Sequence, residues 1–208
     1  MEYLDTYDEA KNFLGKRSRD YVHKNALWHN TVHCWLYDKN GNVYFQIRKG
    51  EGKLYTTASG HVLAGETIAQ AFGREVAEET GVNINQADAE LVNVYIFKMD
   101  KLQSDGSMFR DRAFSNVYIC EYSGDENDLQ FDLDELDGLA KDNAKQTLEL
   151  FKKGKGKIPA RIIKNEDGKN VATECDVCFS DFLVNEHETA IDKYGDVLEK
   201  VIKNIQAD

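Results

Sequence analysis

The sequence predicts an α/β (α+β) fold in which a mixed β-sheet lies between layers of helix. The pattern consists of β-prone runs early in the chain, a central helical segment, and further helical segments near the end. The length of 208 residues is large for one compact domain and small for two full-sized domains. We therefore expect one domain at 24–164, with a helical N-terminal extension at 1–23 and a helical C-terminal extension at 165–208 packed on the same domain.

The first segment is predicted to be a helix, and strands follow it. Residues 6–22 have a helix-forming composition, with Thr6 or Asp8 as the start. Alternating β-prone residues at 29–37 and 43–47 flank an Asn-Gly pair, a combination that predicts a hairpin.

A central helix is predicted between two capping residues. A short strand at 54–58 leads toward it, Thr67 is the expected N-cap, and Gly81 is the expected C-cap. Helical spacing predicts an apolar stripe that faces the core, formed by Ile68, Ala69, Phe72 and Val76.

The second half of the chain is expected to add two strands and a helix. Residues 91–97 and 114–122 are β-prone, and the polar segment 100–112 between them is predicted to be a loop that could cover a site. Residues 141–151 have a helical pattern. The lysine-rich segment 152–157 is interpreted first as a flexible linker and second as a phosphate-binding loop.

The last segment begins with a strand-like run from Ile158 and a turn at 165–170, and two amphipathic helical stretches are expected before residue 206. Cys34 and Cys120 lie in apolar runs, which is typical of reduced core cysteines. Cys175 and Cys178 form a single CxxC, for which two thiols near a turn is the simplest interpretation.

Composition limits the classes of partner. The net charge is −11 and no broad basic stripe is present, which argues against a nucleic-acid polymer as partner. Small phosphorylated ligands stay allowed, because metal ions neutralise phosphates locally. Neither a secretory signal nor an apolar run of membrane-spanning length is visible, so we expect a cytoplasmic protein that does not enter a membrane.

Three acids on the central helix predict a metal site. Glu75, Glu78 and Glu79 lie at i, i+3 and i+4, so their carboxylates crowd one helix face. Like charges in this arrangement repel, and a bound cation would reverse the sign of the interaction. Hard oxygen ligands suit Mg²⁺ or Mn²⁺. The alternative is an ordinary solvated helix, in which Arg74 and Glu78 form an ion pair.

The spacing of residues 60–82 resembles the Nudix box. This segment, GHVLAGETIAQAFGREVAEETGV, satisfies the pattern G-x(5)-E-x(7)-R-E-U-x-E-E-x-G-U, where U is a bulky aliphatic residue. The glycines and charged residues of the pattern are Gly60, Glu66, Arg74, Glu75, Glu78, Glu79 and Gly81. Nudix hydrolases bind divalent metal with the helix of this box and hydrolyse a nucleoside diphosphate linked to another group. The resemblance therefore implies a Nudix-type α/β/α sandwich and a small-molecule diphosphate substrate.

The same resemblance implies roles for individual residues. The backbone carbonyl of Gly60 would join Glu75, Glu78 and Glu79 in the metal shell, with Glu78 as our first choice of ligand. Arg74 would orient the glutamates, and Glu66 would support that network by hydrogen bonding. Glu78, Glu75, Arg74 and Glu66 are therefore the expected catalytic residues.

The general base is not identified by the sequence. Members of the family use either a glutamate of the box or an acid from a distant loop. Loop acids of this chain include Asp105, Asp111 and Glu121. The resemblance also allows a homodimer, which is common in the family.

A narrower resemblance covers residues 24–122, which are similar to the Nudix branch related to type 1 isopentenyl-diphosphate isomerase. His29 and His61 fall where that isomerase places metal-binding histidines, and they are additional metal-ligand candidates. The alternative for His29 is an ordinary histidine of a strand.

Two departures separate this chain from the isomerase. The isomerase needs a cysteine immediately before the Gly-His pair, where this chain has Ser59, and serine is a poor substitute for a thiol in proton transfer. It also needs a glutamate in the strand after the box, where this chain has Ala113 or Phe114. The complete box favours hydrolysis of a diphosphate bond. An isomerase-like enzyme and a catalytically silent nucleotide-binding module are the alternatives.

Overall fold

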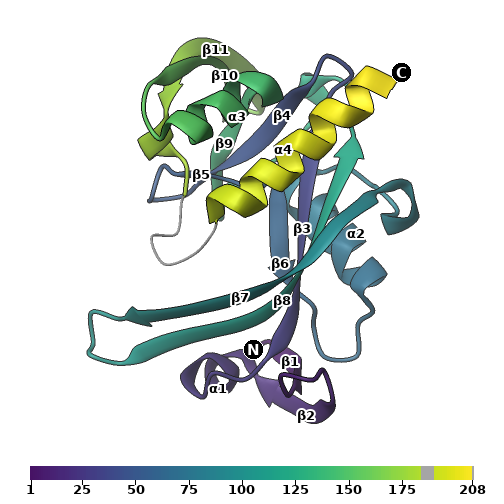
Figure 1. Ribbon diagram of the computed structural model, residues 1–208, viewed down its shortest axis with the longest axis vertical. Coiled ribbons are helices and arrows are strands. Elements are labelled where there is room, and N and C mark those ends of the chain that lie inside the picture. Colours follow the sequence, from purple (N-terminus) through teal and green to yellow (C-terminus); the bar gives the residue numbers. More distant parts are fainter. Residues whose placement is uncertain (184–189, 208) are drawn as a thin grey trace.

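The computed structural model describes residues 1–183 and 190–207, and within them one large mixed sheet organises the molecule (Figure 1). The strand order is β11-β10-β9-β4-β3-β8-β7, with β5 paired to β4 and β6 paired to β3. Neighbours β3 and β8 are parallel, and the other pairs are antiparallel. The strands are β3 (His29–Tyr37), β4 (Asn42–Arg48), β5 (Leu54–Tyr55), β6 (Ala58–His61), β7 (Glu90–Leu102), β8 (Met108–Glu121), β9 (Leu136–Asn143), β10 (Lys157–Glu166) and β11 (Lys169–Cys178).

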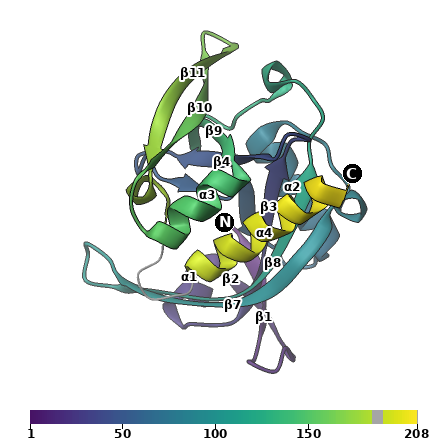
Figure 2. The ribbon, with the colours of Figure 1, turned by 45° about the horizontal axis from the view of Figure 1, so that its top comes forward.

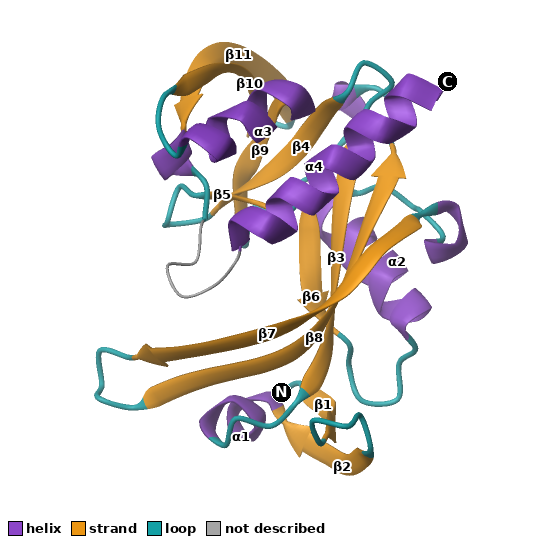
Figure 3. Ribbon diagram, in the orientation of Figure 1, coloured by secondary structure: helices purple, strands orange, loops and turns teal. Residues whose placement is uncertain are grey.

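Helices cover both faces of the sheet, as the α/β/α prediction requires. Helix α2 (Ile68–Thr80) packs on one face, whereas α3 (Ala144–Lys153) and α4 (Ala190–Ala207) lie side by side on the other (Figures 2 and 3). The sheet has a hydrophobic core on each face, and alternate residues of β3 pack in one core or the other, because side chains of a strand alternate between its faces. Cys34 packs in the core that contains α2, and Trp35 packs in the core that contains α3 and α4.

The caps predicted for α2 are confirmed. The Thr67 hydroxyl accepts from Gln70 N, and the Gln70 side chain accepts from Thr67 N, which forms a capping box. Gly81 ends the helix with φ +72°, a left-handed conformation that favours glycine.

The helix predicted at 6–22 is wrong. Strands β1 (Tyr3–Tyr7) and β2 (Phe13–Ser18) form a separate two-stranded sheet, and only α1 (Arg19–Lys24) is helical. The Asp8 carboxylate accepts hydrogen bonds from Ala10 N and Asn12 N, so it closes a turn between the strands and does not start a helix. The N-terminal extension is therefore mainly a β-hairpin.

The loop predicted at 100–112 is also wrong. Strands β7 and β8 extend through most of that segment as a long hairpin that projects from the body of the molecule (Figure 1), and only the turn around Asp105 interrupts them. Polar residues alternate along this arm because much of it is exposed to solvent, so composition alone suggested a loop.

The C-terminal segment contains less helix than predicted. The expected strand and turn are confirmed as β10 and its connection to β11, but β11 occupies a segment expected to be helical. Helix α4 is the α-helix described beyond residue 166, and the expected boundary at 164 falls inside β10. Across the described parts of the chain, all helices are too short or too polar to cross a membrane.

Candidate active site

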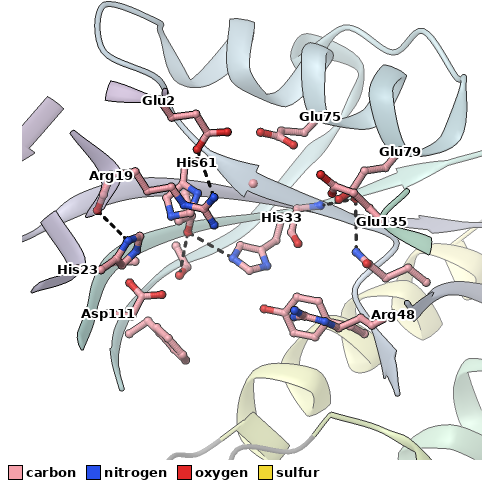
Figure 4. A pocket seen from close by; sticks show the side chains of 18 of the residues that line it. Glu2, Arg19, His23, His33, Arg48, His61, Glu75, Glu79, Asp111 and Glu135 are labelled. Atoms are coloured by element: carbon pink, nitrogen blue, oxygen red, sulfur yellow. Dashed lines mark hydrogen bonds and ion pairs between the residues drawn. The ribbon is translucent and has the colours of Figure 1, made fainter. Parts of the chain in front are cut away.

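A cavity of about 740 Å³ opens where β6, α2, α1 and the β7–β8 hairpin meet. Acids from α2 line one end, and histidines line the other (Figure 4). Gly60 and His61 are consecutive residues of β6, so this short strand connects the two ends.

The acidic end depends on close contact between β6 and α2. A Cβ atom placed on Gly60 would overlap the carboxylate of Glu75, so only glycine leaves room for this side chain. Glu75 is largely buried, and this burial raises its pKa. The glycine of the box therefore has a steric role in the site that the structure shows directly.

Glu79 is the most deeply buried acid of the helix, with 4% of its surface exposed. Its Oε2 accepts a hydrogen bond from Ser59 N at 2.9 Å and one from Gln46 Nε2 at 3.4 Å. Burial, together with the nearby carboxylates of Glu75 and Glu135, raises the pKa of Glu79 to about 9. A cation beside these carboxylates would offset both effects.

Arg74 joins the acids of the box. Its Nε and Nη2 donate to Glu66 at 2.9 and 3.0 Å, and its Nη1 donates to Glu75 at 2.7 Å and to Glu78 at 3.1 Å. Nη2 also donates to the carbonyl of His61 at 2.9 Å, which ties the helix to β6. Glu66 in turn accepts from Leu63 N, so the guanidinium has a fixed anchor.

Glu78 lies differently from its two neighbours. Its side chain is 55% exposed and turns toward Arg74, whereas Glu75 and Glu79 line the cavity. Without movement of its side chain, our first-choice ligand is therefore the outermost of the three acids.

Three histidines gather at the opposite end of the cavity, where His23 and His61 line the wall and His29 is buried next to them. His23 comes from α1, His29 from β3 and His61 from β6, and one nitrogen of each lies within 4.8 Å of the others. The Asp111 carboxylate of β8 completes the group, with Oδ1 3.4 Å from His29 Nε2. The sequence indicated His29 and His61 only, because His23 was assigned to a separate helical extension.

The unpaired atoms of this group point to a metal site. His23 Nδ1 and His29 Nδ1 contact the carbonyls of Arg19 and Leu27 at 3.0 and 3.1 Å, which fits N–H donation and leaves each Nε2 as an acceptor. Both Nε2 atoms and Asp111 Oδ1 are buried without a hydrogen-bond partner. Burial lowers the pKa of His29 to about 4 and that of His61 to about 2. Neutral imidazoles are the form that binds a metal.

The predicted general-base candidates are scattered. Asp111 belongs to the histidine group, Asp105 binds Ser107 in the hairpin turn, and Glu121 is exposed at the end of β8. Glu135, which the sequence did not single out, lines the cavity beside Glu79 (Figure 4). In the sequence, Glu135 lies within an acid-rich segment between Glu121 and Asp137 that does not distinguish it from its neighbours.

Basic and aromatic side chains occupy the remaining wall. Arg48 and Lys49 line the acidic end, where their charges suit phosphate oxygens. The Arg48 guanidinium lies over the Tyr55 ring, 5.7 Å from its centroid. The lysine-rich segment 152–157 does not contribute described lining to the cavity, so its interpretation as a phosphate-binding loop gains no support here.

The comparisons with known proteins agree with this geometry. A family model described as the NUDIX domain matches residues 27–157. A Nudix hydrolase of Clostridium acetobutylicum is 30% identical over 177 residues, which cover 81% of this chain and 83% of that protein. Nudix hydrolase 3 of Arabidopsis thaliana is 26% identical over 125 residues, covering 57% of this chain and 16% of that protein.

A crystal structure from Deinococcus radiodurans has a similar fold, with a TM-score of 0.51 and 21% identity over 74% of this chain and 90% of that one. The chain belongs to the Nudix hydrolase family. The matched range begins after α1 and ends before α4, so the wall residue His23 and helix α4 lie outside it.

Proposed function

We propose that this Nudix hydrolase cleaves the diphosphate bond of a nucleoside diphosphate linked to another moiety, or of a similar organic diphosphate, with Mg²⁺ or Mn²⁺ as cofactor. The observation that carries the proposal is a pair of carboxylates, the largely buried Glu75 and the buried Glu79, on the wall of a cavity that also presents Arg48 and Lys49. Two buried acids without a cation between them are electrostatically unfavourable. The proposed cofactor would remove that penalty.

The donor set of the acidic end fits a hard divalent cation. Glu75, Glu79 and the carbonyl of Gly60 would hold it, with Glu78 joining after a rotation of its exposed side chain. When bound, the cation supplies neutralisation of phosphate charge and lowers the pKa of a coordinated water. The histidine group, which includes His29 and His61, fits a second divalent cation with a preference for nitrogen ligands.

The protein's own residues bind and position the substrate. Arg48 and Lys49 would bind the phosphates, and Arg74 fixes the orientation of Glu75 through its contacts with Glu66 and His61. Attack of water on one phosphorus breaks the bridging P–O bond, gives two monophosphate products and releases a proton. Glu135 lies within the cavity, and we assign it the role of accepting this proton.

The two alternatives are less well supported. The site lacks the two proton-transfer groups that an isomerase needs, because Ser59 and Ala113 line the cavity where a thiol and a carboxylate are required. A silent binding module would not need the complete set of box acids. The four free cysteines support our further proposal of a reducing, cytoplasmic location.

A substrate panel tests the proposed function. The full chain is incubated with Mg²⁺ or Mn²⁺ and with nucleoside diphosphates, sugar nucleotides, dinucleotides and organic diphosphates, and release of phosphate or monophosphate is measured. We expect release from at least one class and its loss when EDTA removes the cation. Binding of a compound without release would support the binding module, and double-bond migration in isopentenyl diphosphate without release would support the isomerase.

A further inference from the structure

We propose that two copies of this chain associate through the edge strand β7, whose residues 96–102 pair antiparallel with the same residues of the second copy about a two-fold axis at Met99. The inference assigns one particular surface and one particular register to this contact. It goes beyond the proposed hydrolysis and does not depend on it.

Strand β7 forms one edge of the large sheet. Among the strands that the structure describes, it pairs only with β8, and the two continue together as the projecting arm (Figure 1). Native proteins usually blunt such an edge with a proline, a bulge or a short strand. Residues 93–102 contain no proline and pair with β8 without a register shift. The edge therefore has the length and regularity that a further strand needs.

Side-chain contacts on the arm show which residues face the outer edge. Arg112 Nη1 donates to the carbonyl of Met99 at 3.1 Å and to that of Asp111 at 2.7 Å. Met99 and Asp111 lie opposite each other on β7 and β8, so one nitrogen reaches both carbonyls only where these point between the strands. Because peptide groups alternate in direction along a strand, the even-numbered residues between 96 and 102 direct theirs toward the outer edge.

The side chains of these even-numbered residues complement a second copy of themselves. Ile96, Lys98, Asp100 and Leu102 share one face of the strand. Rotation about the axis at Met99 sets Ile96 opposite the partner's Leu102, and these two side chains are 49% and 68% exposed in the single chain. The same rotation sets Lys98 opposite the partner's Asp100. Each apolar side chain thus meets an apolar one, and each charge meets its opposite.

The two charges also select the register. A shift of two residues in one direction sets Lys98 opposite the partner's Lys98, and a shift in the other direction sets Asp100 opposite the partner's Asp100. Like charges directly opposite each other repel, so both shifted registers are disfavoured. A strand of unrelated sequence would meet the same pair of charges without matching them. A second copy in the register centred on Met99 is therefore the favoured occupant of the edge.

Contacts within the chain leave both charges accessible. Lys98 lies 3.5 Å from Glu9, and Asp100 lies 2.6 Å from Arg112. The side chains of Lys98 and Asp100 are nevertheless 52% and 47% exposed, so each can contact an opposite charge across the edge.

Pairing also covers apolar surface of the arm. Leu102 lies opposite Met108 of β8, and Ile96 lies opposite Phe114. In the dimer, the exposed side chains of Met108 and Leu102 continue into the partner's Ile96 as one apolar row. Because the paired segment is short, the interface is at the small end of specific complexes, and we expect a reversible dimer with a micromolar dissociation constant.

Exchange of the two charges tests the inference. Analytical ultracentrifugation of the full chain from about 1 to 300 µM should show a reversible equilibrium between monomer and dimer. Lys98→Asp and Asp100→Lys each set like charges opposite one another and should weaken association by at least about 10-fold. An equimolar mixture of the two variants restores opposite charges at every pair and should associate, as should the double variant.

Lys164→Asp is the matched control, because Lys164 is exposed on β10, away from this edge, and it should associate like wild type. Thermal unfolding checks that each variant is folded. A wild-type chain that stays monomeric over the whole range would overturn the inference. Association that both single charge variants leave unchanged would also overturn it.

A cysteine at the axis tests the register itself. In the proposed pairing, Met99 lies opposite the partner's Met99 with Cα atoms about 4.5 Å apart, a distance that a disulfide can span. Met99→Cys should therefore form a linked dimer with oxidised glutathione. Lys101→Cys is the control, since it lies opposite the partner's Phe97, and wild type measures any linkage through the exposed Cys175. Linkage of Met99→Cys no faster than that of Lys101→Cys or wild type would contradict the register.

Discussion

At the scale of single residues, the candidate site depends on close contacts that a family pattern cannot reveal. Only glycine fits at position 60, because a side chain there would overlap the carboxylate of Glu75. Arg74 reaches Glu66, Glu75 and Glu78 at once, so a single guanidinium orders most of the acids. The sequence predicted which residues gather, and helix geometry explained why Glu79 lies deepest. The differing exposure of Glu78 depends on tertiary packing and could not be predicted.

We expect Gly60→Ala to reduce kcat/KM by roughly 100-fold, because the added methyl displaces the Glu75 carboxylate from its place in the cavity. Steady-state kinetics with the best substrate of the panel would measure the loss. Gly73→Ala is the matched control on α2, since its nearest neighbour would be the Ile84 carbonyl at 3.5 Å, an ordinary contact. Wild-type kinetics in Gly60→Ala would show that Glu75 need not occupy this position.

A buried aspartate outside the cavity predicts how stability depends on pH. Burial raises the pKa of Asp142 to about 7, against an ordinary value of 3.8, and its Oδ2 lacks a partner. The folded state therefore holds this proton more tightly than the unfolded state. Protonated Asp142 therefore contributes to the free energy of unfolding. The contribution is fully present below pH 4 and is lost as the pH rises to about 7, and it amounts to at most about 4 kcal/mol.

Asp142→Asn should remove that dependence, because an amide keeps an acceptor for the Thr147 hydroxyl and does not ionise. Urea unfolding between pH 5 and pH 8 would measure it. Relative to wild type, the variant should gain stability as the pH rises, whereas the exposed control Asp128→Asn should follow wild type. A constant difference between Asp142→Asn and wild type would contradict the assignment.

At the scale of elements, local patterns predicted what local forces determine. The β3–β4 hairpin, the capped helix α2 and the strand β10 follow from turn residues, capping residues and apolar spacing. The N-terminal strands were not predicted, because an aspartate such as Asp8 is common both at the start of a helix and in a turn. Here its carboxylate accepts hydrogen bonds within a turn. The β7–β8 arm was missed because much of it is exposed to solvent, so its polar composition suggested a loop although its strands pair as a hairpin.

The α1 element has a functional prediction of its own, since it contributes His23 to the histidine group. We expect wild-type protein to bind Co²⁺ with visible absorption bands typical of nitrogen ligation, and His23→Gln to weaken this binding by roughly 10–100-fold. His33→Gln is the control, because His33 lines the cavity outside the group. Equal Co²⁺ binding by His23→Gln and wild type would rule out the site.

At the scale of the whole molecule, segments outside the matched domain complete the cavity. The N-terminal unit supplies His23 to the main cavity, and α4 supplies Tyr194 and Val197 to a smaller second cavity, although both segments were predicted only as helical extensions. The sheet with helices on both faces was predictable from the order of strands and helices. The shared cavity was not, because it depends on how the extensions pack against β3 and β8.

In the proposed function, glutamates of α2 serve cation-dependent cleavage of a diphosphate bond. The most direct measurement is Mg²⁺-dependent phosphate release by Glu79→Gln beside wild type and the exposed control Glu149→Gln, with thermal unfolding of all three. We predict that Glu79→Gln turns over substrate at least roughly 100-fold more slowly than wild type and keeps the wild-type unfolding temperature. The control should match wild type in both measurements. Near-normal turnover in a folded Glu79→Gln variant would contradict the claim.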